Sequence, residues 1–305
     1  MARRSPALTY RLLGLFLLGV AGAGFVLGWS QIRQDVLVVL TFHGIVDTPQ
    51  QPWETTYADL LNHLARFRRH GYAALAPDEF WDWWAGRLPA GRRFLLTFDD
   101  GLESTGRAIA RLAREEGIRS LWFIVTGLLG KPGFMTPEGL VALASETGCR
   151  LGLHGGTHEE FPKILAAGRD LAGEVGRAKA DLERLVGGPV EFFAYPYGVH
   201  DPASRQVVAS SGLRVGFTVE PWSVQRTDDP YLLPRLMYLR GHEEFGDWTP
   251  PPEARSGGLT MTLAMFAVLM ALRMFLKAGE IEGRLRLAQG AARADRDLPN
   301  GDVSS

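Results

Sequence analysis

Cysteine is almost absent from this 305-residue chain, and its scarcity limits how the protein can be built. With Cys149 as the only thiol, neither an intramolecular disulfide nor a cluster of thiolate metal ligands can form. We expect Cys149 to be a small buried residue. Excess charge is absent too, because 33 basic and 34 acidic residues nearly cancel, and this balance gives no indication of nucleic-acid binding. Internal repeats are also lacking, so the length predicts one large α/β domain with additional segments.

Long uncharged runs do occur, and the first lies near the N-terminus. Three arginines within the first 11 residues precede an uncharged stretch at 12–30, which is long enough to cross a bilayer. Basic residues on this side predict a cytoplasmic N-terminus. A cleaved signal peptide is the alternative, with the small residues at 21–23 as its cleavage site. We favour an uncleaved anchor because the apolar run continues through 25–27, and either interpretation predicts that the following domain is exported.

A second apolar run lies near the C-terminus. It is apolar on all sides, which suits lipid or a buried helix, and the basic residues after it fit the positive-inside bias. A core or interface helix of the soluble domain is the alternative. The sequence thus predicts 1–34 as a cytoplasmic tip with a transmembrane or signal-anchor helix, 35–248 as the main domain, 249–258 as a linker, 259–277 as a second transmembrane helix and 278–305 as a polar, disordered tail.

Between these ends, short apolar runs alternate with longer amphipathic ones. The short runs predict strands at 36–42, 72–75, 94–98, 120–125, 150–153, 190–195 and 215–219. Apolar residues at helical spacing predict helices at 56–70, 104–116, 137–146, 170–185 and 203–210. This order predicts an α/β fold with a parallel sheet and helices outside it. Seven repeats favour a closed or nearly closed barrel over an open two-domain sheet.

Polar residues follow four of the predicted strands. In parallel α/β folds the working groups lie where the strands end, so these side chains should converge on one face. They are His43 after the first strand, Asp99 and Asp100 after the third, His154 after the fifth, and Tyr195, Pro196 and Tyr197 after the sixth.

Adjacent carboxylates indicate a positive partner. Asp99 and Asp100 repel each other, so both stay ionised only near a positive charge such as a metal ion. His154 and His158 are spaced i and i+4, which lets both rings face one point. Imidazole suits zinc, cobalt or nickel, and with Asp100 the pair makes a two-histidine, one-carboxylate set. Two surface histidines are the alternative interpretation.

Three motifs together resemble the polysaccharide deacetylases, carbohydrate esterase family 4. They are Thr97-Phe98-Asp99-Asp100-Gly101, His154-x-x-x-His158 and Tyr195-Pro196-Tyr197-Gly198, within a resemblance that spans about residues 35–245. The resemblance implies a distorted (β/α) barrel of about seven strands. It implies that Asp100, His154 and His158 hold a divalent metal, usually zinc. It also implies Asp99 as general base and the backbone N–H of Tyr197 as an oxyanion donor.

The general acid differs from the family's usual pattern. Most members use a C-terminal Leu-x-His motif, to which His242 is a poor match. Residues 40–47 instead resemble the N-terminal motif of a circularly permuted subgroup, which includes deacetylases of the exopolysaccharide poly-β-1,6-N-acetylglucosamine. This resemblance implies His43 as the acid. A histidine that only hydrogen-bonds a neighbouring loop is the alternative.

The third motif also departs from the family. The arginine that usually steadies the base is replaced by Ala194. We expect Arg235 to supply the charge from a distant loop, and a surface or structural arginine is the alternative. Tyr195, Pro196 and Trp222 are expected to bind substrate. The aromatic cluster at 80–84 is expected to pack a helix onto the barrel rather than stack on sugars or lie at a membrane interface.

Together these features predict an exported, membrane-anchored, metal-dependent hydrolase that removes N-acetyl groups from an N-acetylhexosamine polysaccharide. An exopolysaccharide is favoured as substrate, and proteins of exopolysaccharide synthesis or export are the expected partners. A deacetylase of peptidoglycan, chitin or lipid-linked sugar is one alternative, and a non-catalytic glycan-binding envelope protein is another.

Overall fold

The structure is a computed structural model that describes residues 35–240, together with positions 10, 12, 13, 15, 16, 19 and 276. Residues 32–254 form one unit, and a second unit of 1–31 and 255–305 lies almost wholly outside the described residues. Most of the two expected membrane segments, and all of the linker and the tail, therefore fall outside the described residues. Within that part, no helix combines the length and the apolar character needed to span a bilayer.

One parallel sheet organises the domain, with strand order β7-β6-β5-β4-β3-β1-β8 and β2 also paired to β3. The strands are β1 (Val36–Phe42), β2 (Ala73–Ala74), β3 (Arg92–Phe98), β4 (Leu121–Ile124), β5 (Arg150–Leu153), β6 (Phe192–Ala194), β7 (Val215–Phe217) and β8 (Leu236–Met237). The sheet forms a distorted (β/α) barrel, which confirms the expected fold class.

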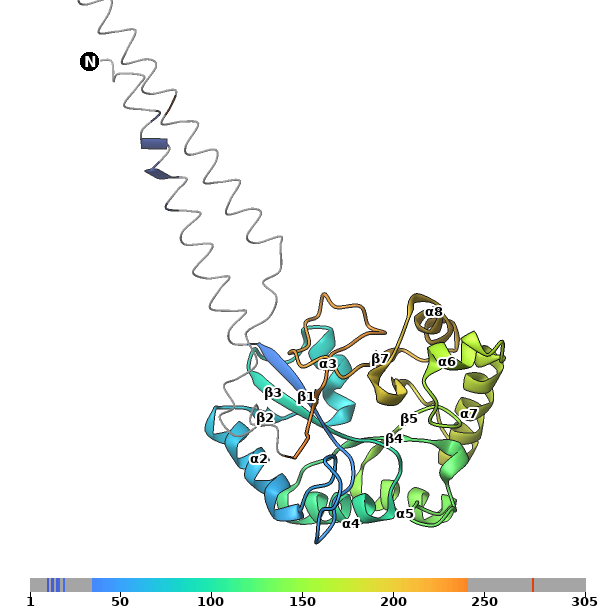
Figure 1. Ribbon diagram of the computed structural model, residues 1–305. Coiled ribbons are helices and arrows are strands. Elements are labelled where there is room, and N and C mark those ends of the chain that lie inside the picture. The colour runs from blue at the N-terminus through green and yellow to red at the C-terminus, as the bar shows by residue number, and fades with distance from the viewer. Residues whose placement is uncertain are drawn as a thin grey trace, which may run out of the picture. The chain divides into compact units, whose positions relative to one another are not determined.

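Helices flank the sheet, and all of them except α3 pack on its outer apolar layer (Figure 1). They are α2 (Tyr57–Arg69), α3 (Phe80–Trp84), α4 (Glu103–Arg111), α5 (Pro137–Thr147), α6 (Phe161–Ala166), α7 (Leu171–Val186) and α8 (Pro202–Ser210). Shorter turns are η1 (Pro77–Glu79), η2 (Leu112–Glu116), η3 (Thr126–Leu128) and η4 (Pro196–Gly198). All predicted strands and helices are present within a few residues, whereas α6 and β8 were not predicted.

Strand alternation separates two apolar layers. In β1, Leu37 and Val39 belong to a cluster inside the barrel, and Val38 and Leu40 belong to the layer beneath the helices. The aromatic cluster of α3 joins the inner layer, where the Phe80 ring meets the rings of Phe192 and Phe217. Phe80 and the neighbouring Trp83 are buried, so the packing interpretation of this cluster is confirmed.

The chain after β7 runs along both edges of the sheet. Leu233 forms a parallel bridge with Phe217 of β7, and Leu236 then pairs with Leu40 of β1. No strand was predicted in this segment, which follows the last predicted strand at 215–219. The segment from Leu233 to Leu236 thus connects β7 to β1, and we call it the seam of the barrel. Arg235 lies between these two pairings, and its side chain is buried inside the seam.

Candidate active site

The site begins at the end of β3. Side chains alternate along a strand, so Leu95, Thr97 and Asp99 face the barrel interior, and Asp99 is buried. The following residue would point the other way, but Asp100 adopts a positive φ of 73° and Gly101 one of 87°. The turn brings the Asp100 carboxylate to the two histidines, with 3.2 Å between its Oδ1 and Nε2 of His158.

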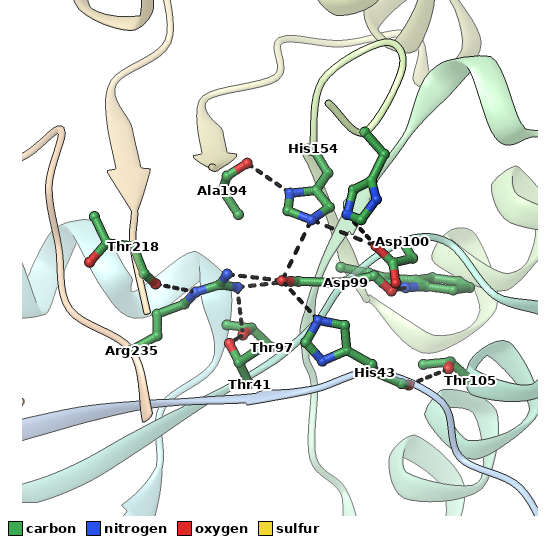
Figure 2. A network of polar contacts seen from close by, with 12 residues as sticks. Thr41, His43, Thr97, Asp99, Asp100, Thr105, His154, Ala194, Thr218 and Arg235 are labelled. Carbon is green, nitrogen blue, oxygen red and sulfur yellow. Dashed lines mark hydrogen bonds and ion pairs between the residues drawn. The ribbon is translucent and has the colours of Figure 1, made fainter. Parts of the chain in front are cut away.

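Asp99 is held by a buried guanidinium. Arg235 Nη1 donates to Asp99 Oδ1 over 2.8 Å, and Nη2 donates to Oδ2 over 2.9 Å (Figure 2). Arg235 Nε donates to the Thr218 carbonyl, so the side chain is fixed from both ends. Burial alone would raise the pKa of Asp99. The Arg235 charge and hydrogen bonds, with smaller effects of His154 and His43, outweigh burial and lower that pKa.

The first candidate ligand histidine, His154, is oriented by the backbone of β6. His154 Nδ1 lies 2.7 Å from the Ala194 carbonyl oxygen. A carbonyl only accepts hydrogen bonds, so Nδ1 carries the proton and Nε2 presents its lone pair to the carboxylates. Burial lowers the pKa of His154 to about 3, against the opposing attraction of Asp99, so the imidazole is neutral at pH 7.

The second histidine lies on a loop that leaves β5, residues 154–158, which we call the metal loop. The loop packs so closely on η3 that a Cβ at Gly127 would lie 2.3 Å from the Gly156 carbonyl oxygen. The His158 ring contacts that of Tyr197 at 4.7 Å between centroids. Burial lowers the pKa of His158 as well, which favours the neutral form that binds metals.

These residues fit a divalent cation. Asp100, His154 and His158 each offer one ligand atom, and these atoms lie within 4.8 Å of one another. Asp100 Oδ1 is buried without a hydrogen-bond partner among the described residues, although it faces both imidazoles. Burial, opposed by His43 and aided by Asp99, raises the pKa of Asp100 to about 6. A bound cation would satisfy this oxygen and favour its charged form.

His43, which follows β1, approaches the carboxylate of Asp99. Its Nε2 lies 3.8 Å from Asp99 Oδ2, the distance that also separates His154 Nε2 from that oxygen. Thr105 Oγ1 donates to the His43 carbonyl over 2.6 Å and ties the strand end to α4. Figure 2 shows both rings directed at Asp99 from opposite sides. The acid role expected for His43 is compatible with this position and stays a prediction.

Outside glycine, left-handed backbone in the described part of the chain occurs at this site. Among the described residues, the non-glycine positions with positive φ are Asp100, His158 and Tyr197. Such conformations cost about 1–3 kcal/mol each and persist only where the surroundings impose them. The Tyr197 side chain is 60% exposed beside His158, so its ring lies where a substrate could reach it.

Two residues expected to bind substrate are placed differently. The Tyr195 side chain is fully buried, packed edge-on against Phe193 and beside Phe161 in the layer under the helices. Pro196 is also buried, beside the metal loop. Neither side chain can contact a glycan in this structure, because alternation along β6 directs Tyr195 away from the barrel interior. Trp222 is 36% exposed after β7, and its role stays a prediction.

Several supporting groups were not predicted. Trp122 Nε1 donates to the Asp99 carbonyl over 3.3 Å. Thr41 and Thr97 share a 2.6 Å hydrogen bond beneath the carboxylate. Alternation along the two strands could have placed both threonines inside the barrel, but no local signal marks Trp122.

The cluster of candidate ligands, Asp100, His154 and His158, is partly exposed to solvent. Asp100 and His158 keep 17% and 23% of their side-chain surface exposed, whereas His154 is buried. A groove of about 590 Å³ lies beside the cluster, lined mainly by η3 and α7 with Gly156 and Thr157 of the metal loop. Its lining does not include the three candidate ligands, so this groove is separate from the ligand cluster.

Comparisons with known proteins agree with this geometry. The model of the polysaccharide deacetylase family matches residues 88–216. IcaB from Ammonifex degensii is 26% identical, with a TM-score of 0.60 over 77% of this chain and 97% of that one. The BpsB deacetylase domain from Bordetella bronchiseptica shares the fold at 23% identity, with a TM-score of 0.53 over 66% and 94% of the two chains. YxkH of Bacillus subtilis is 21% identical over 211 residues, 67% of this chain and 72% of that protein. With the TFDDG motif and the two histidines at one barrel rim, these matches show a polysaccharide deacetylase domain over residues 88–216.

Proposed function

We propose that the protein is a metal-dependent N-deacetylase that releases acetate from an N-acetylhexosamine exopolysaccharide. The observation that carries the proposal is the convergence of three ligand atoms beside a buried carboxylate and a further histidine. Asp100, His154 and His158 would hold the cation, with zinc the first choice and cobalt or nickel as replacements. A cation bound there supplies positive charge that acidifies water and polarises an amide carbonyl.

The remaining residues divide the proton transfers. Asp99 stays ionised at neutral pH because Arg235 pairs with both of its oxygens, so it can accept a proton from the attacking water. A carboxylate with a lowered pKa is a weak base, so Asp99 should hold this proton only briefly before passing it on. His43 Nε2 faces the same oxygen and would deliver a proton to the leaving amine. The backbone N–H of Tyr197 would stabilise the oxyanion.

Three features favour an exopolysaccharide as the substrate. The candidate acid, His43, precedes the carboxylate pair in the chain, as in the permuted subgroup. Similarity to IcaB covers 97% of that protein, so the likeness extends over the whole domain. The exposed rim at Asp100 and His158 suits a polymer better than a small molecule enclosed on all sides.

Location and partners follow from the sequence outside the described residues. We propose that the uncharged stretch at 12–30 anchors the protein in the inner membrane, with the catalytic domain on the periplasmic or extracellular side. The run at 259–277 would be a second anchor. In that setting, proteins of exopolysaccharide synthesis or export are the natural partners.

A panel of N-acetylated glycans tests the substrate. Full-length protein is incubated with β-1,6-linked and β-1,4-linked N-acetylglucosamine oligomers and with peptidoglycan, and free amine is measured. We expect the highest kcat/KM on the β-1,6-linked series. Preference for peptidoglycan would contradict the exopolysaccharide assignment, and no release from any glycan would contradict the activity itself.

A further inference from the structure

His158 is the most weakly held of the three candidate ligands. His154 is fixed by the Ala194 carbonyl and by burial, whereas His158 is partly exposed and adopts a φ of 62°. A residue other than glycine needs support from its surroundings to keep this backbone conformation. The residues on either side of His158 show where that support originates.

Each neighbour of His158 binds one member of the Arg169–Glu174 ion pair, in which Glu174 lies in the first turn of α7 and Arg169 lies just before that helix. Thr157 Oγ1 donates to Glu174 Oε1 over 2.9 Å. On the other side, Glu159 accepts two hydrogen bonds from Arg169 Nη1, over 2.7 and 2.8 Å. Arg169 Nη2 in turn donates to Glu174 Oε2 over 2.9 Å. The four side chains form a closed path around His158, which we call the loop clamp.

Glu174 is the central member of the loop clamp. Its side chain is 14% exposed, against 41% for Arg169 and 49% for Glu159, so solvent screens its contacts least. It also packs on the loop directly, because a Cβ at Gly156 would lie 3.5 Å from Glu174 Cγ. Arg169 comes from the short connection between α6 and α7, so two elements outside the barrel hold one face of the metal loop.

We infer that Glu174, with Arg169 and Thr157, positions His158 and thereby sets the affinity of the site for its divalent cation. This inference rests on the proposed metal site and adds residues that touch no ligand atom. Groups that orient a metal-binding histidine typically change metal affinity by about 10-fold to 100-fold when removed. The loop clamp acts on the backbone beside His158, so we expect the lower end of this range.

Cobalt binding to the full-length protein tests the inference. Metal is removed with a chelator, and the Kd for Co²⁺ is measured by chelator competition for the unmodified chain, Glu174→Gln and Thr157→Val. Glutamine keeps an oxygen that can accept from Thr157 but loses the charge that pairs with Arg169. We expect each variant to bind Co²⁺ about 10-fold more weakly. Because Thr157 and Glu174 belong to one hydrogen-bonded path around His158, the double variant should lose less than the product of the two effects.

A matched variant separates positioning from general stability. Glu183 lies on the same helix, nine residues beyond Glu174, and accepts hydrogen bonds from Lys179 over 2.6 Å and from the Val190 N–H over 3.0 Å. Glu183→Gln should lower the Tm of the metal-free protein about as much as Glu174→Gln and leave the Co²⁺ Kd unchanged. Cobalt affinity of Glu174→Gln within 2-fold of the unmodified chain would overturn the inference alone. No saturable Co²⁺ binding by the unmodified chain would overturn both this inference and the proposed metal site.

Discussion

Arg235 and Asp99 lie 136 positions apart in the sequence and meet through two hydrogen bonds inside the barrel. The seam that follows β7 brings them together, because Leu233 pairs with one edge strand and Leu236 with the other. The guanidinium is fully buried and lies over the Phe123 ring, so the pair is shielded from solvent. This contact supplies the positive charge that Ala194 cannot provide in the third motif.

Removal of Arg235 should impair both stability and turnover. Arg235→Ala leaves Asp99 as an unpaired buried charge, which typically costs about 3–5 kcal/mol. Displacement of the carboxylate should lower kcat by roughly 100-fold. Urea unfolding and acetate release measure the two effects. Arg205→Ala is the control, because Arg205 makes a similar two-bond pair with Asp229 away from the site.

The less disruptive Arg235→Lys keeps a charge but not the paired geometry. It should recover part of the stability and little of the turnover, because a single ammonium cannot bind both oxygens of Asp99. Turnover of Arg235→Ala within a few fold of the unmodified enzyme would refute a role for this arginine in the reaction.

His43 should matter most when the leaving group needs a proton. His43→Gln should lower the rate of amide cleavage in N-acetylglucosamine oligomers by about 10²-fold to 10⁴-fold. Hydrolysis of 4-nitrophenyl acetate, whose leaving group departs without protonation, should change only a few fold. An equal loss on both substrates would show that His43 does not act as the acid.

The buried His154 should make the metal-free protein acid-sensitive. Its folded pKa is about 3 and its unfolded pKa about 6.5, so the unfolded chain binds more protons between these values. The contribution of His154 to the free energy of unfolding therefore rises with pH, and this contribution is lost as pH falls below about 6.5. This residue should contribute a loss of about 2 kcal/mol between pH 7 and pH 5.

Urea titrations of metal-free protein at several pH values measure this loss. His154→Gln removes the titrating group, so its stability should depend less on pH by the same amount. Parallel curves for the two proteins would show that His154 carries no such proton difference.

Tyr195→Phe tests the structural role of a residue first expected at the substrate. The Tyr195 hydroxyl is buried without a hydrogen-bond partner among the described residues. Its removal relieves an unsatisfied polar group, so the free energy of unfolding should be unchanged or higher by about 1 kcal/mol. KM for the glycan should not change, whereas a rise in KM of several fold would restore the substrate-binding assignment.

Local patterns predicted the strands and the motif residues because both depend on neighbours in sequence. The alternation of side chains along β3 directs Asp99 into the barrel. The same rule applied to β6 places Tyr195 in the outer layer. The two-residue β8 carries no periodicity, so its pairing with β1 needed the assembled barrel. The loop clamp is also invisible in sequence, because Glu174 and Arg169 look like ordinary solvent-facing charges until the metal loop folds against α7.

Acetate release by the full-length protein from N-acetylglucosamine oligomers, measured before and after metal removal, tests the central claim most directly. The account predicts that a chelator abolishes release, that Zn²⁺ or Co²⁺ restores it, and that Asp100→Ala shows neither metal binding nor release. Release that persists after complete metal removal, or that survives in Asp100→Ala, would contradict the assignment of Asp100, His154 and His158 as the catalytic metal site.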